Sequence, residues 1–198
     1  MTKRSGRAAL EAALSLGILA GWSAPALAAD APPSPPIRLQ PEGHFETPGF
    51  ALLVYHNDYL VGRRGGLQAF LHGRRVFDAG ELVARGTDGK DYGTGSAKMG
   101  ARVVDAAAGT ATVPGKVAAL GLDFRITTRT DGRSVLATVV FDRPLDWTKV
   151  ASVGLKLELF PEQFWHKSYL GDGKAGVFPE RNNGPRTFVA AAHEIRLA

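Results

Sequence analysis

The stretch from residue 122 to residue 141 constrains the fold more than any other part of the chain. Apolar residues occupy every second position from Leu122 to Ile126, and again from Val135 to Phe141. A period of two is that of a strand with one buried face. Between the two runs lies an Asp-Gly pair, Asp131-Gly132, which is a strong turn signal for a hairpin. The sequence therefore predicts an antiparallel hairpin here.

Comparable patterns recur along the chain. Apolar residues alternate with polar ones from Val153 to Leu159, and a second hairpin is expected to turn at His72-Gly73. Between the 122–141 hairpin and the strand that starts at Val153, Asp146 is expected to cap a helical turn. Further strands are expected over residues 50–56, 66–71, 75–83, 99–107, 110–120 and 187–197. Roughly eight to ten short strands without a long helix predict an all-β fold, an antiparallel β-sandwich.

The first 28 residues have the three parts of a secretory signal peptide. A basic start with Lys3, Arg4 and Arg7 precedes an apolar stretch over 12–20, and Ala26-Leu27-Ala28 is a small-x-small cleavage site. An amphipathic N-terminal helix is the alternative, but it would not need that ending. The apolar stretch is too short to span a membrane, so no transmembrane segment is expected. We expect an exported protein, periplasmic or extracellular.

A proline-rich segment follows, in which only Ser34 separates Pro32-Pro33 from Pro35-Pro36. Such a segment is extended and cannot pack as a helix or a central strand, so it is interpreted as a tether. The expected organisation is a signal peptide over 1–28, a proline-rich linker over 29–43 and a β-sandwich accessory domain over 44–198.

Charge and cysteine content exclude several classes of function. The chain has 24 Lys and Arg against 19 Asp and Glu, a net charge of +5. Loss of the signal peptide would remove three bases and Glu11, leaving 21 against 18 and a net charge of +3. The remaining bases are dispersed, so no nucleic-acid partner is expected. The absence of cysteine excludes disulfides, a cysteine nucleophile and thiolate metal sites.

The usual catalytic motifs are missing. The glycine-rich stretch over 88–95 matches neither phosphate-binding fingerprint, and the five histidines lack zinc-protease spacing. The acidic pair in Asp78-Ala79-Gly80-Glu81 could serve a glycosidase, but turn chemistry accounts for it more simply. No catalytic residue, cofactor or metal is expected in this chain.

The most unusual segment runs from Phe160 to Pro179 and is rich in aromatic residues on a loop-like stretch. Aromatic faces beside polar side chains suit sugar rings, which have apolar faces and hydroxyl rims. The candidate carbohydrate contacts are Trp165, Tyr169, Asp172 and Phe178. The simpler interpretation is that these aromatics close one end of the sandwich or pack against a neighbouring domain, because Phe and Trp in ordered loops are usually buried.

A series of short motifs occurs in order at residues 49–57, 66–73, 147–153, 157–161, 167–179 and 183–185. Together they resemble the N-terminal β-sandwich of large secreted bacterial glycoside hydrolases of the cellulase-like family nine. In that family, as the resemblance implies, a following α/α six-hairpin domain carries the acid and base carboxylates. One departure is local: the family pattern has glycine before Lys-Ser-Tyr, where this chain has His166. Because Asp78-Ala79-Gly80-Glu81 lies in a predicted hairpin, no catalytic role is transferred to it.

Three functions are compatible with these observations. The leading hypothesis is an accessory β-sandwich of an exported glycoside hydrolase involved in polysaccharide degradation, with the six-hairpin catalytic domain of the same enzyme as its partner. Because the sequence stops at Ala198 in or just after an expected strand, we expect that domain to follow. The alternative is a free-standing periplasmic carbohydrate-binding module that binds a polysaccharide or oligosaccharide. A structural envelope protein without a ligand is the third. None of them makes this chain alone an active hydrolase.

Overall fold

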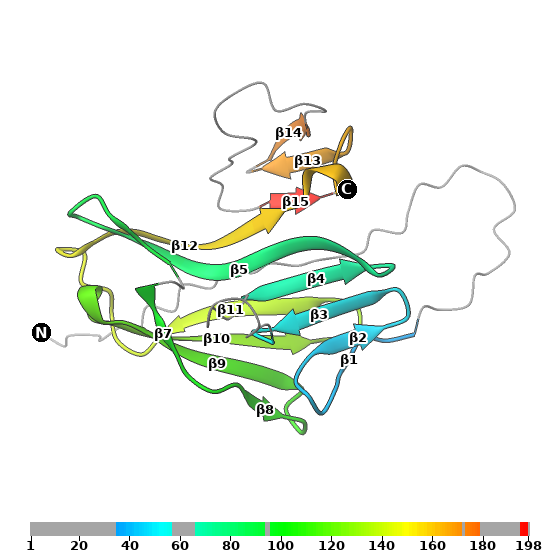
Figure 1. The fold of residues 1–198 in the computed structure, drawn as a ribbon, viewed down its shortest axis with the longest axis horizontal. Helices are drawn as coiled ribbons and strands as arrows, with labels where there is room; N and C mark the ends of the chain where they lie inside the picture. Colours follow the sequence, from blue (N-terminus) through cyan, green and yellow to red (C-terminus); the bar gives the residue numbers. More distant parts are fainter. Residues whose placement is uncertain (1–34, 57–65, 94–95, 172, 179–194, 198) are drawn as a thin grey trace, which may run out of the picture.

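The computed structural model describes residues 35–56, 66–93, 96–171, 173–178 and 195–197, and the fold within them is all-β (Figure 1). Every strand pair is antiparallel, and no α-helix is present in these residues. The predicted all-β antiparallel fold is confirmed. The described residues form more strands than the eight to ten expected. Several of these strands have only two or three residues, which is too short for the alternation of apolar and polar residues to be recognised in the sequence. The expected signal peptide lies outside the described residues.

The largest sheet has the strand order β1-β2-β3-β4-β5-β12, with β6 paired to β5. Its strands are β1 (Arg38–Leu39), β2 (Phe45–Thr47), β3 (Phe50–Val54), β4 (Leu67–Leu71), β5 (Arg74–Gly86), β6 (Asp91–Tyr92) and β12 (Val150–Leu159). The predicted hairpin at His72-Gly73 joins β4 to β5. Both turn residues have positive φ, 49° and 75°, as a two-residue turn of type I′ requires.

The second sheet has the order β11-β10-β9-β7, with β8 paired to β9. Its strands are β7 (Lys98–Met99), β8 (Val103–Asp105), β9 (Thr110–Val117), β10 (Leu122–Thr130) and β11 (Val135–Phe141). The predicted hairpin of residues 122–141 is β10–β11, in register from Phe124 opposite Phe141 to Thr130 opposite Val135. At its tip the Asp131 carboxylate accepts hydrogen bonds from the backbone N–H groups of Arg133 and Ser134, at 2.8 and 2.7 Å.

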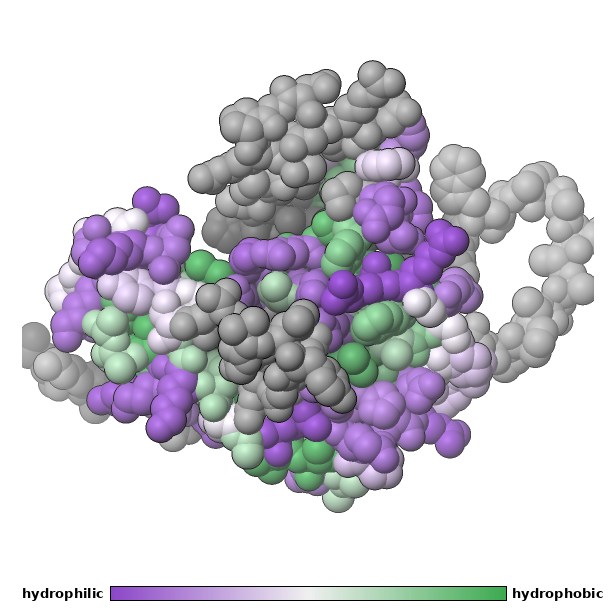
Figure 2. Space-filling model, in the orientation of Figure 1, coloured by the Kyte–Doolittle hydropathy of each residue, from purple (hydrophilic) through white to green (hydrophobic). Residues whose placement is uncertain are grey.

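A third, small sheet has the order β14-β13-β15 and follows the 3-10 turn η3 (Pro161–Gln163). Its strands are β13 (Ser168–Gly171), β14 (Lys174–Val177) and β15 (Ile195–Leu197). In Figure 1 it lies beyond the end of β12, apart from the two larger sheets. Figure 2 shows hydrophobic residues where this small sheet adjoins the sandwich.

The hydrophobic core lies between the two larger sheets and comes from the alternating positions seen in the sequence. On β10, Leu122, Phe124 and Ile126 are buried, and the residues between them face outward. The larger sheet adds Phe45 and Val54, both with no exposed surface. Burial of alternate residues on both sheets is what defines a sandwich.

Part of the segment expected to be a linker belongs to the sandwich. Ile37 is 5% exposed and belongs to the core, and its N–H donates to the carbonyl of Gly132 at 2.8 Å. Arg38 and Leu39 then form β1. The chain after the prolines is therefore held against the tip of the β10–β11 hairpin.

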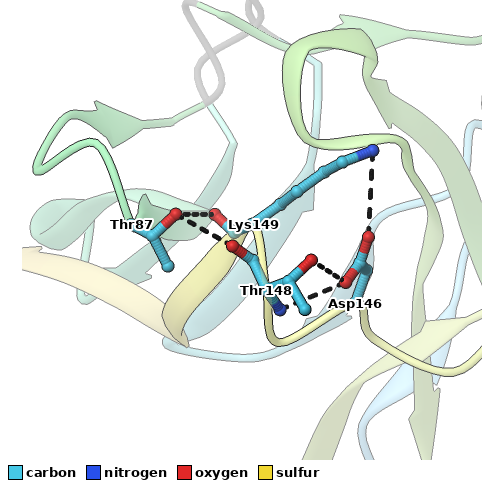
Figure 3. Close-up of polar contacts among 4 residues, drawn as sticks. All are labelled: Thr87, Asp146, Thr148 and Lys149. Carbon is cyan, nitrogen blue, oxygen red and sulfur yellow. Dashed lines mark hydrogen bonds and ion pairs between the residues drawn. The ribbon is translucent and has the colours of Figure 1, made fainter.

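Asp146 caps a turn between β11 and β12, as predicted (Figure 3). Its carboxylate accepts hydrogen bonds from the N–H and hydroxyl of Thr148, at 3.1 and 2.5 Å, and these bonds hold the pKa of the Asp146 carboxyl below its usual range. Thr87, which directly follows β5, stabilises the turn by donating from its backbone N–H to the carbonyl of Lys149 at 2.9 Å. Trp147 in this turn is 60% exposed.

Candidate functional site

Three aromatic residues of the segment 160–179 form a cluster at the small sheet: Phe164, Tyr169 and Phe178. The ring of Phe178 lies 5.3 Å from that of Phe164 and 5.0 Å from that of Tyr169, between ring centroids, in tilted contacts. Phe178 is 7% exposed, whereas Phe164 is half-buried and packs against the sandwich core. The cluster therefore joins the small sheet to the sandwich.

Tyr169 is held by its cross-strand neighbour. It lies opposite Gly176 in the β13–β14 pair, and a Cβ at Gly176 would lie only 2.7 Å from the Cε1 atom of Tyr169. The tyrosine ring thus covers the glycine, an arrangement that compensates for the weak packing of glycine in a strand.

Trp165 stands at the corner of a tight turn beside this cluster. The turn runs from Phe164 to Lys167, whose N–H donates to the carbonyl of Phe164 at 3.0 Å. His166 has a φ of +59°, while Trp165 does not have positive φ, and this is the φ pattern of a type II turn. Glycine is preferred at the position of His166, so the backbone here has the conformation that a glycine would adopt. Trp165 is 48% exposed.

The four predicted carbohydrate contacts differ in their exposure to solvent. Trp165 is exposed, Tyr169 is half-buried and Phe178 is buried, and the last two touch each other. Asp172 lies outside the described residues. An exposed indole offers a flat apolar face to a ligand, whereas the buried ring of Phe178 supports its neighbours from behind.

The acidic pair Asp78 and Glu81 lies in a β-bulge of the central strand β5. Ala79 has a φ of +48°, and the register of both neighbouring strands shifts at this point. The Asp78 carboxylate accepts hydrogen bonds from the Gln68 side-chain amide and the Ala79 N–H, both at 2.7 Å, and from Arg75 at 2.9 Å. Each carboxylate oxygen therefore has a structural partner, and the segment shapes the sheet.

Glu81 and Arg75, which lie on the same strand as the bulge, make further contacts with β12 and with the aromatic segment. The Nζ atom of Lys156 lies 3.9 Å from Glu81, and the guanidinium of Arg75 stacks 4.8 Å from the centroid of the Phe160 ring. The cation–π contact connects the bulge to the beginning of the aromatic segment. A β-bulge changes the direction in which side chains point along a strand. The sequence analysis interpreted residues 78–81 as a simple turn and did not predict this bulge.

The glycine-rich stretch 88–95 begins as a turn between β5 and β6. Asp88 accepts hydrogen bonds from the N–H of Lys90 at 3.1 Å and from the hydroxyl of Tyr92 at 2.9 Å, which lower the pKa of the Asp88 carboxyl. In the part of the chain that the structure describes, no three His, Asp or Glu residues lie together as a metal site would require.

A second polar cluster, which the sequence interpretation missed, lies at the end of β3. The Arg102 guanidinium donates to the carbonyls of Val54, Tyr55 and Glu42, at 2.9, 3.2 and 2.8 Å. Tyr55 is buried with a φ of +52°. Arg102 is 46 to 60 residues from its partners in sequence, so no local pattern could have indicated that it joins them.

His56 is the titratable centre of that cluster. Its Nδ1 accepts the Val54 N–H at 3.1 Å, so the neutral ring carries its proton on Nε2, which donates to the Glu42 carbonyl at 3.0 Å. Burial, followed by the nearby Arg102 charge, lowers the pKa of His56 from 6.5. The ring of His44 lies 5.8 Å away, and His44 itself contacts the Glu46 carboxylate at 3.4 Å.

This lowered pKa predicts a loss of stability in mild acid. The unfolded chain binds the proton more readily than the folded one, so the contribution of neutral His56 is complete above about pH 6.5 and is lost as pH falls through the lower folded pKa. In urea titrations from pH 8 to pH 5, His56→Gln should flatten the fall in unfolding free energy. The exposed turn variant His72→Asn is the control and should follow the parent chain. Parallel curves for all three would contradict this assignment.

Comparisons with known proteins do not assign this chain to a family. No protein-family model matches the chain, and searches of curated proteins and of solved structures return no significant match. The class that the structure defines is an all-β antiparallel sandwich with a small aromatic-lined sheet at one end. Within the described ranges there is no helix long and apolar enough to cross a membrane.

Proposed function

We propose that this chain is an accessory β-sandwich of an exported glycoside hydrolase and braces the six-hairpin catalytic domain of the same enzyme. The observation that carries the proposal is the exposed apolar face of the small sheet. Val177 is 62% exposed and Leu170 is 37% exposed. Both lie on the opposite face of the β13–β14 hairpin from Tyr169, because side chains alternate along a strand. Exposed apolar side chains gathered on one sheet face favour a surface that another domain covers.

Two further observations support this proposal. The motifs that resemble the family-nine sandwich occur in order between residues 49 and 185, and the first 28 residues have the parts of an export signal. In addition, the acidic segment at 78–81 is held in a bulge by Arg75 and Gln68, as a structural element would be. These observations agree with a supporting role for the sandwich in polysaccharide degradation.

The coding DNA downstream of codon 198 tests this proposal. We expect a frame that continues into, or directly adjoins, a sequence of several hundred residues with a six-hairpin pattern and paired carboxylates. A stop codon at this point, with no neighbouring frame that encodes such a domain, would refute the accessory role.

A free-standing carbohydrate-binding module is the second candidate. The observation that favours it is the 48% exposure of Trp165 on an ordered turn, since aromatic residues presented in this way bind sugar rings. In this case the isolated chain would bind β-glucan oligosaccharides, and calorimetry would detect heat on mixing. Absence of heat with every glycan, together with aggregation through the apolar sheet face, would favour the accessory domain instead.

A further inference from the structure

We propose that the free edge of β12 is an interface between two copies of this chain. The two β12 strands pair antiparallel about a twofold axis at Leu157, and the larger sheet then continues from one copy into the other. The proposal goes beyond the accessory role, because it assigns a different partner to a different surface from the small sheet and needs no catalytic domain.

The first argument is the position of β12 in the larger sheet. The sheet ends at this strand, which pairs with β5 and with no other strand of the described residues (Figure 1). β12 is 10 residues long and contains no proline. The free edge of such a strand presents a row of backbone N–H and C=O groups that can pair with another strand.

The bulge at Ala79 does not interrupt this edge. The register there places two residues of β5, Ala79 and Gly80, opposite Leu157 alone on β12. The additional residue therefore belongs to β5, and exposure along β12 alternates regularly from Ser152 to Leu159. A strand with regular alternation can pair on its free side in a defined register.

The second argument is the incomplete burial of the inward side chains of β12. Their neighbours on β5 are covered almost completely: Leu82 opposite Leu155 is 3% exposed, and Ala84 opposite Val153 has no exposed surface. The inward side chains of β12 itself are only partly buried, although they pack against the core; they are Val153, Leu155, Leu157 and Leu159. Apolar surface therefore remains along this edge, and a partner strand would remove it from water.

The order of residues along β12 selects a second copy as the partner and fixes the register. Residues 155–159 read Leu-Lys-Leu-Glu-Leu. About a twofold axis at Leu157, each leucine lies opposite a leucine, and Lys156 lies opposite Glu158 of the partner subunit on both sides of the axis. A shift by one residue would place polar residues opposite leucines. An axis at Leu155 would place Lys156 opposite glycine and lose both ion pairs.

The charges on β12 also favour self-pairing over other partners. Lys156 contacts Glu158 of its own chain and lies 3.9 Å from Glu81, and the side chains of Lys156 and Glu158 are 44% and 55% exposed. A lysine on an edge strand discourages pairing with an unrelated strand. In the proposed dimer each lysine gains a second glutamate, so the charges alternate in sign across the axis and this cost is absent.

The expected affinity is modest. Only five residues of each strand lie opposite one another, which places the interface among the small ones that form weak or transient complexes. We expect a dissociation constant on the order of 10 µM for the dimer.

Sedimentation equilibrium of the full chain tests the interface. Lys156→Glu and Glu158→Lys should each weaken the dimer by about 10-fold or more, because each places like charges opposite one another at two positions. The double variant Lys156→Glu with Glu158→Lys restores both pairs and should dimerise within about 3-fold of the parent chain. Lys116→Glu is the matched control. Lys116 is also an exposed lysine in an ion pair, 3.2 Å from Asp123, but it lies on β9 of the second sheet and its replacement should leave the dimer unchanged.

Cysteine cross-linking tests the register, and the chain has no cysteine of its own. Leu157→Cys places two thiols beside the axis, so mild oxidation should give a disulfide-linked dimer on a non-reducing gel. Leu155→Cys is the control. Its two copies would lie four residues apart along the strands, about 13 Å, which is beyond the Cα separation of about 7 Å that a disulfide can span. Thermal unfolding of each variant shows whether the sandwich is folded.

Three outcomes would overturn this interface. The first is a parent chain that remains monomeric at about 1 mM, which includes the case in which β12 receives an extended peptide of another protein. The second is a dimer that both single charge reversals leave intact, since association would then involve another surface such as the small sheet. The third is cross-linking of Leu155→Cys in place of Leu157→Cys. None of them bears on the accessory role, which depends on the downstream coding sequence, so the two proposals can fail independently.

Discussion

Replacement of Gly115 by alanine should destabilise the sandwich by about 2–3 kcal/mol, because a well-packed core does not accept an extra methyl group. Gly115 on β9 lies opposite Phe124 on β10, and a Cβ at this position would lie 2.7 Å from one ring carbon of Phe124 and 2.8 Å from another. Phe124 is 2% exposed. Because buried side chains are close-packed, the added methyl group would force the strands to separate or the core to repack.

Gly154→Ala on β12 is the matched control for this prediction. It is also a strand glycine, but nothing lies within 4 Å of the Cβ that would be added. We expect a change within about 0.5 kcal/mol, towards higher stability, because alanine loses less conformational entropy on folding. Urea unfolding at neutral pH measures both variants. The double variant Gly115→Ala with Phe124→Leu should cost less than the sum of the single changes, since the smaller side chain relieves the collision. A Gly115→Ala protein as stable as the parent would disprove this account of the pair.

Asp78→Ala should produce the second large effect, a loss of about 2–3 kcal/mol. Removing the carboxylate leaves the Gln68 amide, which is 2% exposed, without the acceptor that it now has at 2.7 Å. A buried donor that loses its acceptor costs about 1–3 kcal/mol. The Ala79 N–H in the bulge loses its acceptor as well, and so does Arg75. Asp78→Asn keeps one oxygen acceptor and should lose about half as much.

Asp91→Ala is the control, because Asp91 is 65% exposed and pairs with Arg85 at 3.5 Å on the surface. Such pairs contribute about 0–1 kcal/mol. Equal stability losses for Asp78→Ala and Asp91→Ala in urea titrations would show that the bulge network is not structural. The segment at 78–81 would then be open again to a functional interpretation.

The elements that the sequence predicts well are those with local causes. The β10–β11 hairpin follows from alternation and an Asp-Gly turn, and the β4–β5 hairpin follows from His72-Gly73. The turn at Asp146 follows from the capping preference of aspartate. Each of these patterns lies within about 20 residues, so period and turn chemistry are sufficient to read it.

The features at the candidate site depend instead on contacts between distant residues. The bulge at Ala79 is visible only once β5 lies between β4 and β12. Arg102 reaches Glu42 across 60 residues. One signal for the Trp165 turn was present in the sequence. A family position normally held by glycine is His166 here, and it does adopt a positive φ.

The sequence alone determined that this chain forms antiparallel strands, because alternating burial and turn residues act over a few positions. Within the aromatic-rich segment 160–179, the tertiary structure alone decided which of the described aromatic residues are buried and which are exposed. Phe178 and Trp165 belong to the same aromatic-rich segment, yet one is 7% and the other 48% exposed. That difference arises because the burial of a side chain depends on what packs against it from elsewhere in the chain.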